Sequence, residues 1–231
     1  MLSVDEAQHL TRVLRLTTGQ DVRVFNGRGA EFDGIVEQAT RSTVGIRLGA
    51  AVAPVPEARV AITLAHAVLK GDKMDDVVRD AVMMGVTAVQ PVVTERSEVA
   101  LGTLARAHRR ERWERIAISS AKQCGRAVVP PIADPIAFAP ALGGVRAGTL
   151  PSPALMLVEP GAAAALPHGE LAADPPPAAT VFVGPEGGWT AAEVEQARAG
   201  CQLLSLGGRI LRADAMSVVA LAALYTKWQE F

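Results

Sequence analysis

The chain has 231 residues, of which 49% are hydrophobic, 20% charged and 4% aromatic, and its formal net charge is −1. This balance excludes a protein coated in basic charge for nucleic-acid binding, and no stretch reaches the roughly 18 consecutive apolar residues of a membrane-spanning helix. The N-terminus lacks a signal-peptide pattern, and two distant cysteines and four scattered histidines predict neither a disulfide nor a metal site, so we expect a cytoplasmic protein without metal or membrane attachment.

The N-terminal part of the sequence predicts a small β-rich domain. A short helix is expected over residues 6–14, followed by the β-like runs DVRVF, EFDGIVEQ and STVGIRL. Asn26-Gly27 between the first two runs is a strong hairpin signal, and short strands joined by regular turns favour a small barrel. Two prolines in residues 50–58 indicate a linker. We therefore predict one domain over residues 1–52 and a second over residues 57–231.

From Arg59 onward the sequence predicts strands that alternate with helices. RVAITLAHAV is a near-continuous apolar run, as expected for a strand that is buried on both faces. Apolar residues then recur at helical spacing from Met74 to Val82, with Asp72 as the predicted N-cap and Gly85 as the end of the helix. TAVQPVV predicts the next strand, and the helix after it ends at Gly125.

The C-terminal half continues this alternation. Strands are predicted at ALMLVE, TVFVG and QLLSLG, with helices after Thr190 and from about Asp214. Such alternation implies a mostly parallel sheet with helices on both faces. Ala, Pro and Gly dominate residues 130–180, which predicts connections there. The last helix is apolar nearly all round, so it needs burial on several sides, either beneath the sheet or in a dimer interface.

Two glycine-rich turns carry the clearest chemical signal. In GPEGGWTAAE, Thr190 and Glu193 form a predicted capping box that begins a helix directly after the glycines. The turn matches neither phosphate-loop pattern, and Glu186 would repel a phosphate. Taken alone, it could be a structural turn only. SLGGRILRADA repeats the order of strand, glycines and helix, and ligands bind at the carboxyl ends of parallel strands. The pair, with its apolar neighbours, therefore predicts a nucleoside-like ligand.

A local basic cluster stands apart from the neutral average. Between Arg106 and Arg126 the sequence has seven basic residues and two acidic ones. On its own this pattern is typical of a solvated helix face.

Five segments in this order resemble the ribosomal RNA small subunit methyltransferase E family: LKGDKMDDVVRDAVMMGV, ERSEV, AKQCGR, GPEGGWTAAE and LGGRILRADA. HLTRVLRLTTGQDVRVFNGRG is similar to the small PUA-like β-barrel of that family, so the resemblance covers nearly the whole chain. It implies an α/β fold of the SPOUT (α/β-knot) class with a deep C-terminal trefoil knot. It also implies a homodimer that uses S-adenosylmethionine to methylate N3 of a uridine in 16S rRNA of the small ribosomal subunit. Periodicity could not predict a knot, because knots are so rare.

The resemblance further implies where the cofactor lies. S-adenosylmethionine is expected against both glycine turns and the end of the strand ALMLVE. The expected cofactor-binding residues are Val158, Glu159, Val183, Gly184, Pro185, Glu186, Gly187, Gly188, Leu206, Gly207, Arg209, Ile210, Leu211 and Met216.

Uridine N3 bears a proton, so the reaction needs a general base or a cation that stabilises the anion forming on the uracil. The candidate cations are Arg126, Arg209 and Arg212, and the candidate base is Asp214. The family usually has R-x-E-T-A where this chain has Arg212-Ala-Asp-Ala-Met216, and Gly208 replaces a more usual proline. These departures put the role of Asp214 in doubt, and it can equally be only the cap of the last helix.

Beside such a site, the basic cluster becomes a candidate for RNA phosphate contacts. Two other functions remain open for the chain: that of a SPOUT enzyme that acts on a different RNA, or that of a non-catalytic RNA-binding assembly factor that retains the fold. The residues predicted to contact RNA are Arg12, Arg15, Arg28, Lys70, Arg96, Arg112, Arg115, Lys122, Gln123 and Arg126, with Arg23 and Arg109 on the same track.

Overall fold

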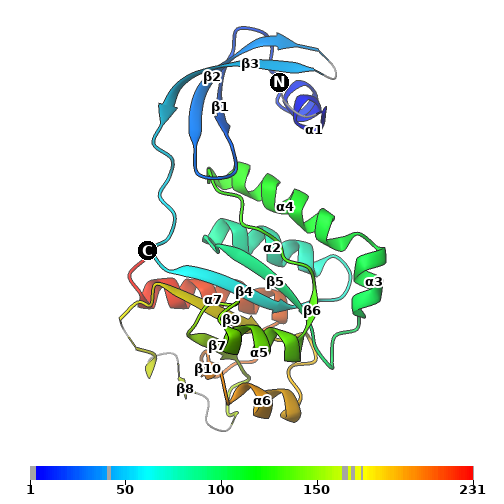
Figure 1. The fold of residues 1–231 in the computed structure, drawn as a ribbon, viewed down its shortest axis with the longest axis vertical. Coiled ribbons are helices and arrows are strands. Elements are labelled where there is room, and N and C mark those ends of the chain that lie inside the picture. The colour runs from blue at the N-terminus through cyan, green and yellow to red at the C-terminus, as the bar shows by residue number, and fades with distance from the viewer. Residues whose placement is uncertain (1–3, 41–42, 163–165, 168–169, 173, 231) are drawn as a thin grey trace. The chain divides into compact units, whose positions relative to one another are not determined.

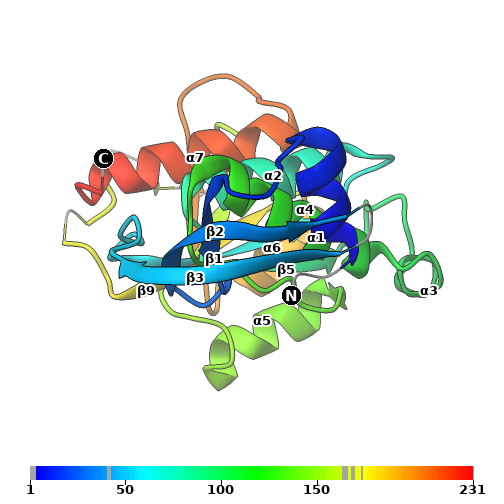
Figure 2. The ribbon, with the colours of Figure 1, turned by 90° about the horizontal axis from the view of Figure 1, so that it is seen from above.

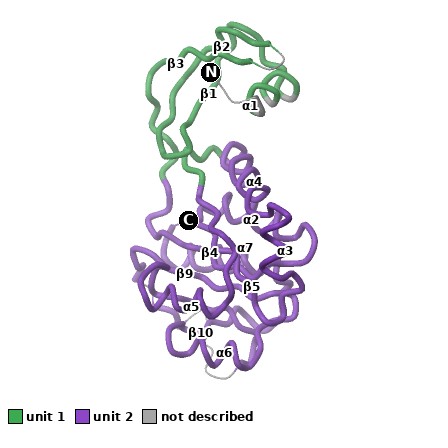
Figure 3. Tube along the Cα trace, turned by 45° about the vertical axis from the view of Figure 1, so that its right-hand side comes forward, with its two compact units in different colours: residues 1–56, 125–129 green, residues 57–124, 130–231 purple. Residues whose placement is uncertain are grey.

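The computed structural model of the chain describes residues 4–40, 43–162, 166–167, 170–172 and 174–230 (Figure 1). It divides into two compact units (Figure 3). Unit 1 combines Met1–Pro56 with Gly125–Val129, and unit 2 combines Glu57–Cys124 with Pro130–Phe231. Unit 1 therefore takes a short segment from the middle of the sequence, which the linear pattern did not predict. No helix in the described ranges is long and apolar enough to cross a membrane.

Unit 1 is a three-stranded antiparallel sheet with a helical segment packed against it. The helix α1 (Val4–Gln8) continues into a π-helical turn, η1 (His9–Val13), and the strands β1 (Asp21–Phe25), β2 (Glu31–Ala39) and β3 (Val44–Val52) follow in sheet order. The predicted helix and strands are confirmed. The buried side chains of Ala7, Val36 and Val44 form the small core between helix and sheet.

The turn between β1 and β2 is a hairpin, as the Asn-Gly signal predicts. The Asn26 Oδ1 atom accepts hydrogen bonds from the backbone N–H groups of Arg28 at 2.8 Å and Ala30 at 3.1 Å. Gly27 has a φ of +74°, a conformation that favours glycine. The segment Gly125–Val129 pairs with this turn, because Gly29 N donates to Ala127 O and Val129 N to Gly27 O, both at 3.0 Å.

Unit 2 is built on a seven-stranded sheet in the order β6-β5-β4-β9-β7-β10-β8, and every pairing in it is parallel. This confirms the predicted parallel sheet. The trefoil knot concerns threading, which strand order does not test, so it stays a prediction. The strands are β4 (Ala61–Ala67), β5 (Ala88–Val93), β6 (Ile136–Ala137), β7 (Ala154–Leu157), β8 (Leu166–Pro167), β9 (Ala178–Val183) and β10 (Gln202–Ser205).

Helices cover both faces of this sheet, as predicted (Figure 2). One face carries α2 (Lys73–Met84) and α7 (Ala213–Lys227), with α4 (Arg109–Cys124) packed on α2. The other face carries α5 (Phe138–Ala147) and α6 (Ala191–Ala197), whose apolar residues join one buried cluster with the sheet. A further short helix, α3 (Leu101–Arg106), precedes α4.

Two helix predictions need correction. The helix α5 lies where connections were predicted. The sequence did not predict a helix there because Pro140 and the pair Gly143-Gly144 lower its helix propensity. It forms because its buried residues, spaced from Phe138 to Val145 at i, i+3, i+4 and i+7, pack on the sheet. Asp72 occupies the N-cap position of α2, but its side chain makes no capping hydrogen bond.

Candidate active site

A cavity of about 300 Å³ lies in unit 2 at the carboxyl ends of β7 and β9. Its walls come from three segments, residues 157–160 after β7, residues 183–189 after β9 and residues 210–216 before and within α7, together with Lys73 at the start of α2. The two predicted glycine turns therefore meet at one site. The predicted cofactor residues in its lining are Val158, Glu159, Val183, Gly184, Pro185, Glu186, Gly188, Ile210, Leu211 and Met216.

Four residues predicted to bind the cofactor lie outside this lining. Leu206 is buried at 9% exposure, while Gly207 and Arg209 are exposed beyond the cavity. The carbonyl of Gly187 accepts a hydrogen bond from the Arg96 guanidinium at 2.7 Å. Conversely, the lining includes residues that were not predicted as cofactor-binding: Lys73, Leu157, Pro160, Trp189, Arg212, Ala213 and Asp214.

Trp189 shapes the floor of the cavity. Its Nε1 atom donates to the Leu157 carbonyl at 2.8 Å, and its ring packs on Phe138 with a centroid separation of 4.9 Å. Gly184 lies so close that a Cβ there would be 3.0 Å from Trp189 Nε1. Gly184 therefore allows the indole to lie against the backbone. The signal was present in GPEGGW, since the tryptophan directly follows the glycines.

The GPEGG loop, residues 184–188, has no room for a side chain at Gly188 either. Gly188 has a φ of +67°, and a Cβ there would be 2.9 Å from Glu159 Oε1. Gly184 and Gly188 thus keep backbone open to the cavity, each beside a side chain that lines it, Trp189 and Glu159.

The predicted capping box is confirmed. Glu193 N donates to Thr190 Oγ1 at 3.2 Å, and Thr190 N donates to Glu193 Oε2 at 2.9 Å. The second carboxylate oxygen of Glu193, which is 3% exposed, accepts from the backbone N–H of Glu95 at 2.9 Å. Glu193 therefore joins the start of α6 to the segment ERSEV, and Arg96 of that segment binds the GPEGG loop.

Lys73 neutralises Glu186 at the mouth of the cavity. Lys73 Nζ lies 2.9 Å from Glu186 Oε1, which also accepts from Lys70 N at 3.4 Å. Partial burial raises the pKa of the Glu186 carboxyl, but the hydrogen bond and charge of Lys73, together with backbone N–H groups of Glu186 and Lys70, outweigh burial and leave the pKa below its ordinary value. The Lys70–Lys73 segment is thereby fixed on the GPEGG loop.

Arg212 and Asp214 form a two-point pair in the cavity wall. Arg212 Nη2 lies 2.7 Å from Asp214 Oδ2, and Arg212 Nε donates to Asp214 Oδ1 at 3.1 Å. Burial raises the pKa of Asp214, but the bond to Arg212 and its charge, together with the backbone N–H groups of Ala215 and Asp214, outweigh burial and lower that pKa. Arg212 occupies the N-cap position of α7, so the alternative in which Asp214 is the cap is wrong. Asp214 lies in the first turn, where the helix dipole favours a carboxylate.

His66, near the end of β4, lies beneath this wall. It is fully buried, and its Nδ1 and Nε2 atoms lie 2.7 Å from the Ala67 carbonyl oxygen and 3.2 Å from the Ala213 carbonyl oxygen. Burial lowers the pKa of His66, against the opposing effects of both carbonyls and of the carboxylates of Glu186 and Asp214. His66 thus links β4 directly to the first residue of α7.

The remaining candidate cations lie elsewhere. Arg126 belongs to unit 1, and Arg209 is exposed outside the cavity. Of the three cations proposed for catalysis, only Arg212 contributes to the described lining.

The basic cluster of unit 2 is partly neutralised by its own neighbours. Arg112 pairs with Asp75 and with Asp72, the latter at 3.2 Å. Arg110 binds Glu114 and Asp134, both at 2.9 Å. Arg109 lies 3.5 Å from Asp72, Lys70 lies 2.8 Å from Glu98, and Arg115 bonds to a carbonyl of its own helix. Lys122 is half-buried and Gln123 is exposed.

Three arginines of unit 1 differ from this cluster. The side chains of Arg12, Arg15 and Arg28 are exposed and make no ion pair or hydrogen bond with the described part of the chain.

Among the residues with assigned positions, no group of three or more His, Cys, Asp and Glu side chains is placed to hold a metal ion.

Comparison with known proteins gives a consistent result over the whole length. The RNA methyltransferase domain family matches residues 56–225, and the RNA methyltransferase PUA domain family matches residues 2–48. Ribosomal RNA small subunit methyltransferase E of Synechocystis sp. is 34% identical over 229 residues, which are 96% of this chain and 71% of that protein. The protein of the same name from Bacillus subtilis is 25% identical over 235 residues, covering 95% and 87%.

Two solved structures resemble the chain in both sequence and fold. Ribosomal RNA small subunit methyltransferase E from Neisseria gonorrhoeae, bound to S-adenosyl methionine, is 34% identical with a TM-score of 0.88, covering 98% of this chain and 91% of that one. A methyltransferase from Legionella pneumophila in complex with the bound cofactor SAM is 29% identical with a TM-score of 0.88, covering 97% and 90%.

Proposed function

Because the chain belongs to the ribosomal RNA small subunit methyltransferase E family, we propose that it transfers a methyl group from S-adenosylmethionine to N3 of a uridine in 16S rRNA. The observation that carries the proposal is the single cavity formed by both glycine turns and the end of β7. Its volume falls in the range of small-molecule sites. Two relatives of the same fold are bound to this cofactor.

The residues of the cavity fit S-adenosylmethionine chemically. Leu157, Ile210 and Leu211 offer apolar surface for a heterocycle, and Gly184 and Gly188 leave backbone open beside them. Glu159 lines the cavity, and its carboxylate has no partner among the residues the structure describes, so it can accept from ribose hydroxyls or from an ammonium. When bound, the cofactor supplies an electrophilic methyl group.

The catalytic contribution of the chain rests on Arg212 and Asp214. As N3 of uridine loses its proton, negative charge develops on the uracil oxygens and needs a nearby cation. Arg212 lines the cavity, whereas Arg209 lies outside it and Arg126 lies in unit 1. Asp214, with its lowered pKa, is a weak base at neutral pH. Its two bonds to Arg212 therefore favour a positioning role, with the guanidinium as the group that stabilises the uracil anion.

Substrate RNA and assembly complete the proposal. Residues 57–231 carry the methyltransferase site, and residues 1–52 bind the rRNA in the cytoplasm. We also propose a homodimer through α7. This helix buries Ala220, Leu221 and Leu224 within the chain, while Val219 remains 40% exposed on another side. Burial of that second apolar face in a partner copy fits the all-round apolar pattern of the helix.

The decisive experiment has two parts. Calorimetry with S-adenosylmethionine tests the cavity, and we expect a dissociation constant well below millimolar. Nucleoside analysis of rRNA from cells that lack the protein tests the product, and 3-methyluridine should disappear from 16S rRNA and return with the intact gene. Unchanged 3-methyluridine with retained cofactor binding would assign the enzyme to a different RNA. Absence of cofactor binding would leave the non-catalytic assembly factor.

A further inference from the structure

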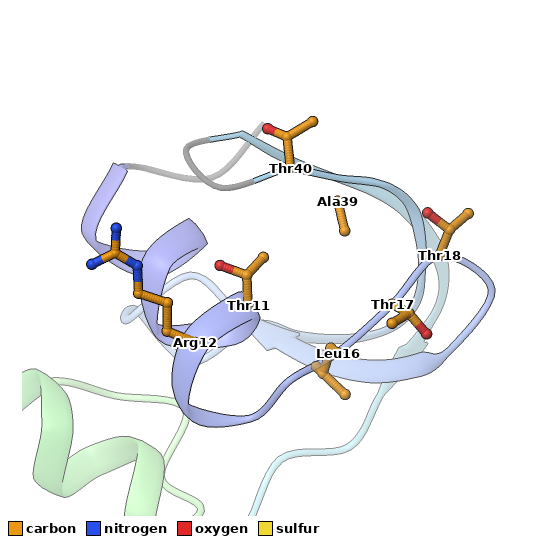
Figure 4. Close-up of a pocket in the computed structure, with 7 residues that line it drawn as sticks. All are labelled: Thr11, Arg12, Leu16, Thr17, Thr18, Ala39 and Thr40. Carbon is orange, nitrogen blue, oxygen red and sulfur yellow. The ribbon is translucent and has the colours of Figure 1, made fainter.

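Arg96 differs from Arg12, although the sequence predicts that both contact RNA. Arg12 lines a cavity of unit 1, where its guanidinium points away from the threonines (Figure 4) and makes no ion pair or hydrogen bond with the described residues. Arg96 instead donates from Nη1 to two backbone carbonyls, to Gly187 O at 2.7 Å and to Trp189 O at 3.3 Å. Its guanidinium is thus bound to the segment that lines the cavity of unit 2.

The GPEGG loop presents one residue to Arg96 and its other residues to the cavity. Four of the five line the cavity of unit 2: Gly184, Pro185, Glu186 and Gly188. The alkyl part of the Arg96 side chain covers the fifth, because a Cβ on Gly187 would be 3.3 Å from Arg96 Cβ and 3.4 Å from its Cδ. Arg96 therefore packs on the part of the loop that does not line the cavity.

The backbone that carries Arg96 is itself fixed in a turn. Ser97 N donates to Thr94 O at 3.2 Å, and Thr94 N donates to Ser97 Oγ at 3.1 Å. Thr94 is buried, and the next residue, Glu95, donates from its N–H to the buried carboxylate of Glu193 at 2.9 Å. Arg96 therefore reaches the loop from a turn whose own position is fixed on both sides.

A guanidinium is suited to bind two carbonyls at once. It carries five N–H donors in a planar fork, and hydrogen bonds from a charged donor are stronger than those between neutral groups. Without it, the carbonyls of Gly187 and Trp189 would bond to water, which imposes no fixed geometry on the loop. The loop would then adopt the arrangement that forms the cavity for a smaller fraction of the time.

We propose that Arg96 is a positioning residue for the cofactor, which keeps the GPEGG loop in the arrangement that binds S-adenosylmethionine. The inference deepens the proposed function and rests on it, since it presumes that the cavity takes this cofactor. It differs from the predicted RNA contact in what it requires. A phosphate contact acts only when RNA is present, whereas a positioning residue changes the affinity for the cofactor alone.

The test measures the affinity of the full chain for S-adenosylmethionine by calorimetry, without RNA. The apparent dissociation constant rises in inverse proportion to the fraction of molecules in the binding-competent form, so a fall of that fraction to about a tenth raises it about tenfold. We expect this for Arg96→Gln. Arg96→Lys keeps the charge on a flexible stem without the planar fork, so it should recover part of the affinity.

Arg146→Gln is the matched control. Arg146 is also exposed and also donates to a backbone carbonyl, that of Gln196 at 3.2 Å, and neither residue lines the cavity. This variant should change the dissociation constant by less than about twofold. The urea midpoints of Arg96→Gln and Arg146→Gln should be close to each other, because each variant loses an exposed arginine.

Single-turnover methylation of small-subunit rRNA separates binding from chemistry. At saturating cofactor, the rate constant of Arg96→Gln should return to within about twofold of the unmodified chain, because the bound cofactor selects the ordered loop. Unchanged cofactor affinity in Arg96→Gln, or an equal loss in Arg146→Gln, would overturn the positioning role alone. If the unmodified chain bound no S-adenosylmethionine, the proposed function would fail together with it.

Discussion

Gly184→Ala is a single methyl group placed where the cavity floor has no room for it. The added Cβ would lie 3.0 Å from Trp189 Nε1 and 3.1 Å from its Cε2 atom. These separations are about 0.5 Å inside ordinary contact, so the indole or the backbone must shift. The indole is fixed on two sides, by its 2.8 Å hydrogen bond to Leu157 O and by its packing on Phe138.

The expected cost follows from these contacts. Overpacking of a fixed ring costs about 1–3 kcal/mol, and losing the indole hydrogen bond adds about 1 kcal/mol. We therefore expect the free energy of unfolding to fall by about 2–4 kcal/mol. Because Trp189 lines the cavity, an indole displaced towards it would also occupy space for the cofactor, and affinity for S-adenosylmethionine should fall at least about tenfold.

Urea unfolding measures the first effect and calorimetry the second. Gly208→Ala is the control, since a Cβ there would meet no atom within 4 Å and the residue lies outside the cavity lining. It should change the unfolding free energy by less than about 1 kcal/mol. If Gly184→Ala unfolded at the same urea concentration as the unmodified chain and bound the cofactor equally well, the role assigned to Trp189 would be wrong.

Three further predictions concern residues that support the site. Glu193→Gln replaces one carboxylate oxygen, which accepts either from Glu95 N or from Thr190 N, with an amide NH₂ group that cannot accept. Urea unfolding should show that the free energy of unfolding falls by about 2–3 kcal/mol. An unchanged unfolding midpoint would contradict the bridge between α6 and the segment ERSEV. His66 has a pKa lowered by burial, so the unfolded chain binds its proton more readily; its contribution to stability is present above pH 6.5 and is lost as the pH falls below that value. His66→Gln should therefore flatten the acid-side decline of the unfolding free energy, and a decline as steep as that of the unmodified chain would refute this. Asp214→Asn should lower the single-turnover rate constant of methylation by less than Arg212→Ala does, because Asp214 positions the guanidinium and Arg212 contacts the uracil. A larger loss of rate in Asp214→Asn than in Arg212→Ala would make Asp214 the base.

The architecture was predictable because its signals are local. The apolar run of β4, the helical spacing from Met74 to Val82 and the Thr190–Glu193 capping box each fix an element within a few residues. The helix α5 was missed because only tertiary packing overrides its Pro140 and its two adjacent glycines.

The site was predictable at the level of segments and less so at the level of atoms. Both glycine turns meet as expected, but which residues face the cavity depends on side-chain packing. Lys73 reaches Glu186 from a segment more than a hundred residues earlier in the chain, a pairing that no spacing rule reveals. Likewise, Arg112 of α4 is neutralised by Asp75 of α2 and by Asp72 just before α2. The sequence alone therefore overstates how many charges of the basic cluster are available to RNA.

The segment 125–129 has a consequence for how the chain is made on the ribosome. Domains commonly fold in the order of synthesis, with the N-terminal one first. Here β1 and β2 emerge early, but the backbone that pairs with their turn follows only after β4, α2, β5, α3 and α4 have been translated. Unit 1 therefore cannot complete its own hydrogen bonds until about half of unit 2 has been synthesised. A gene fragment that stops at residue 56 would encode an N-terminal unit that lacks this pairing partner.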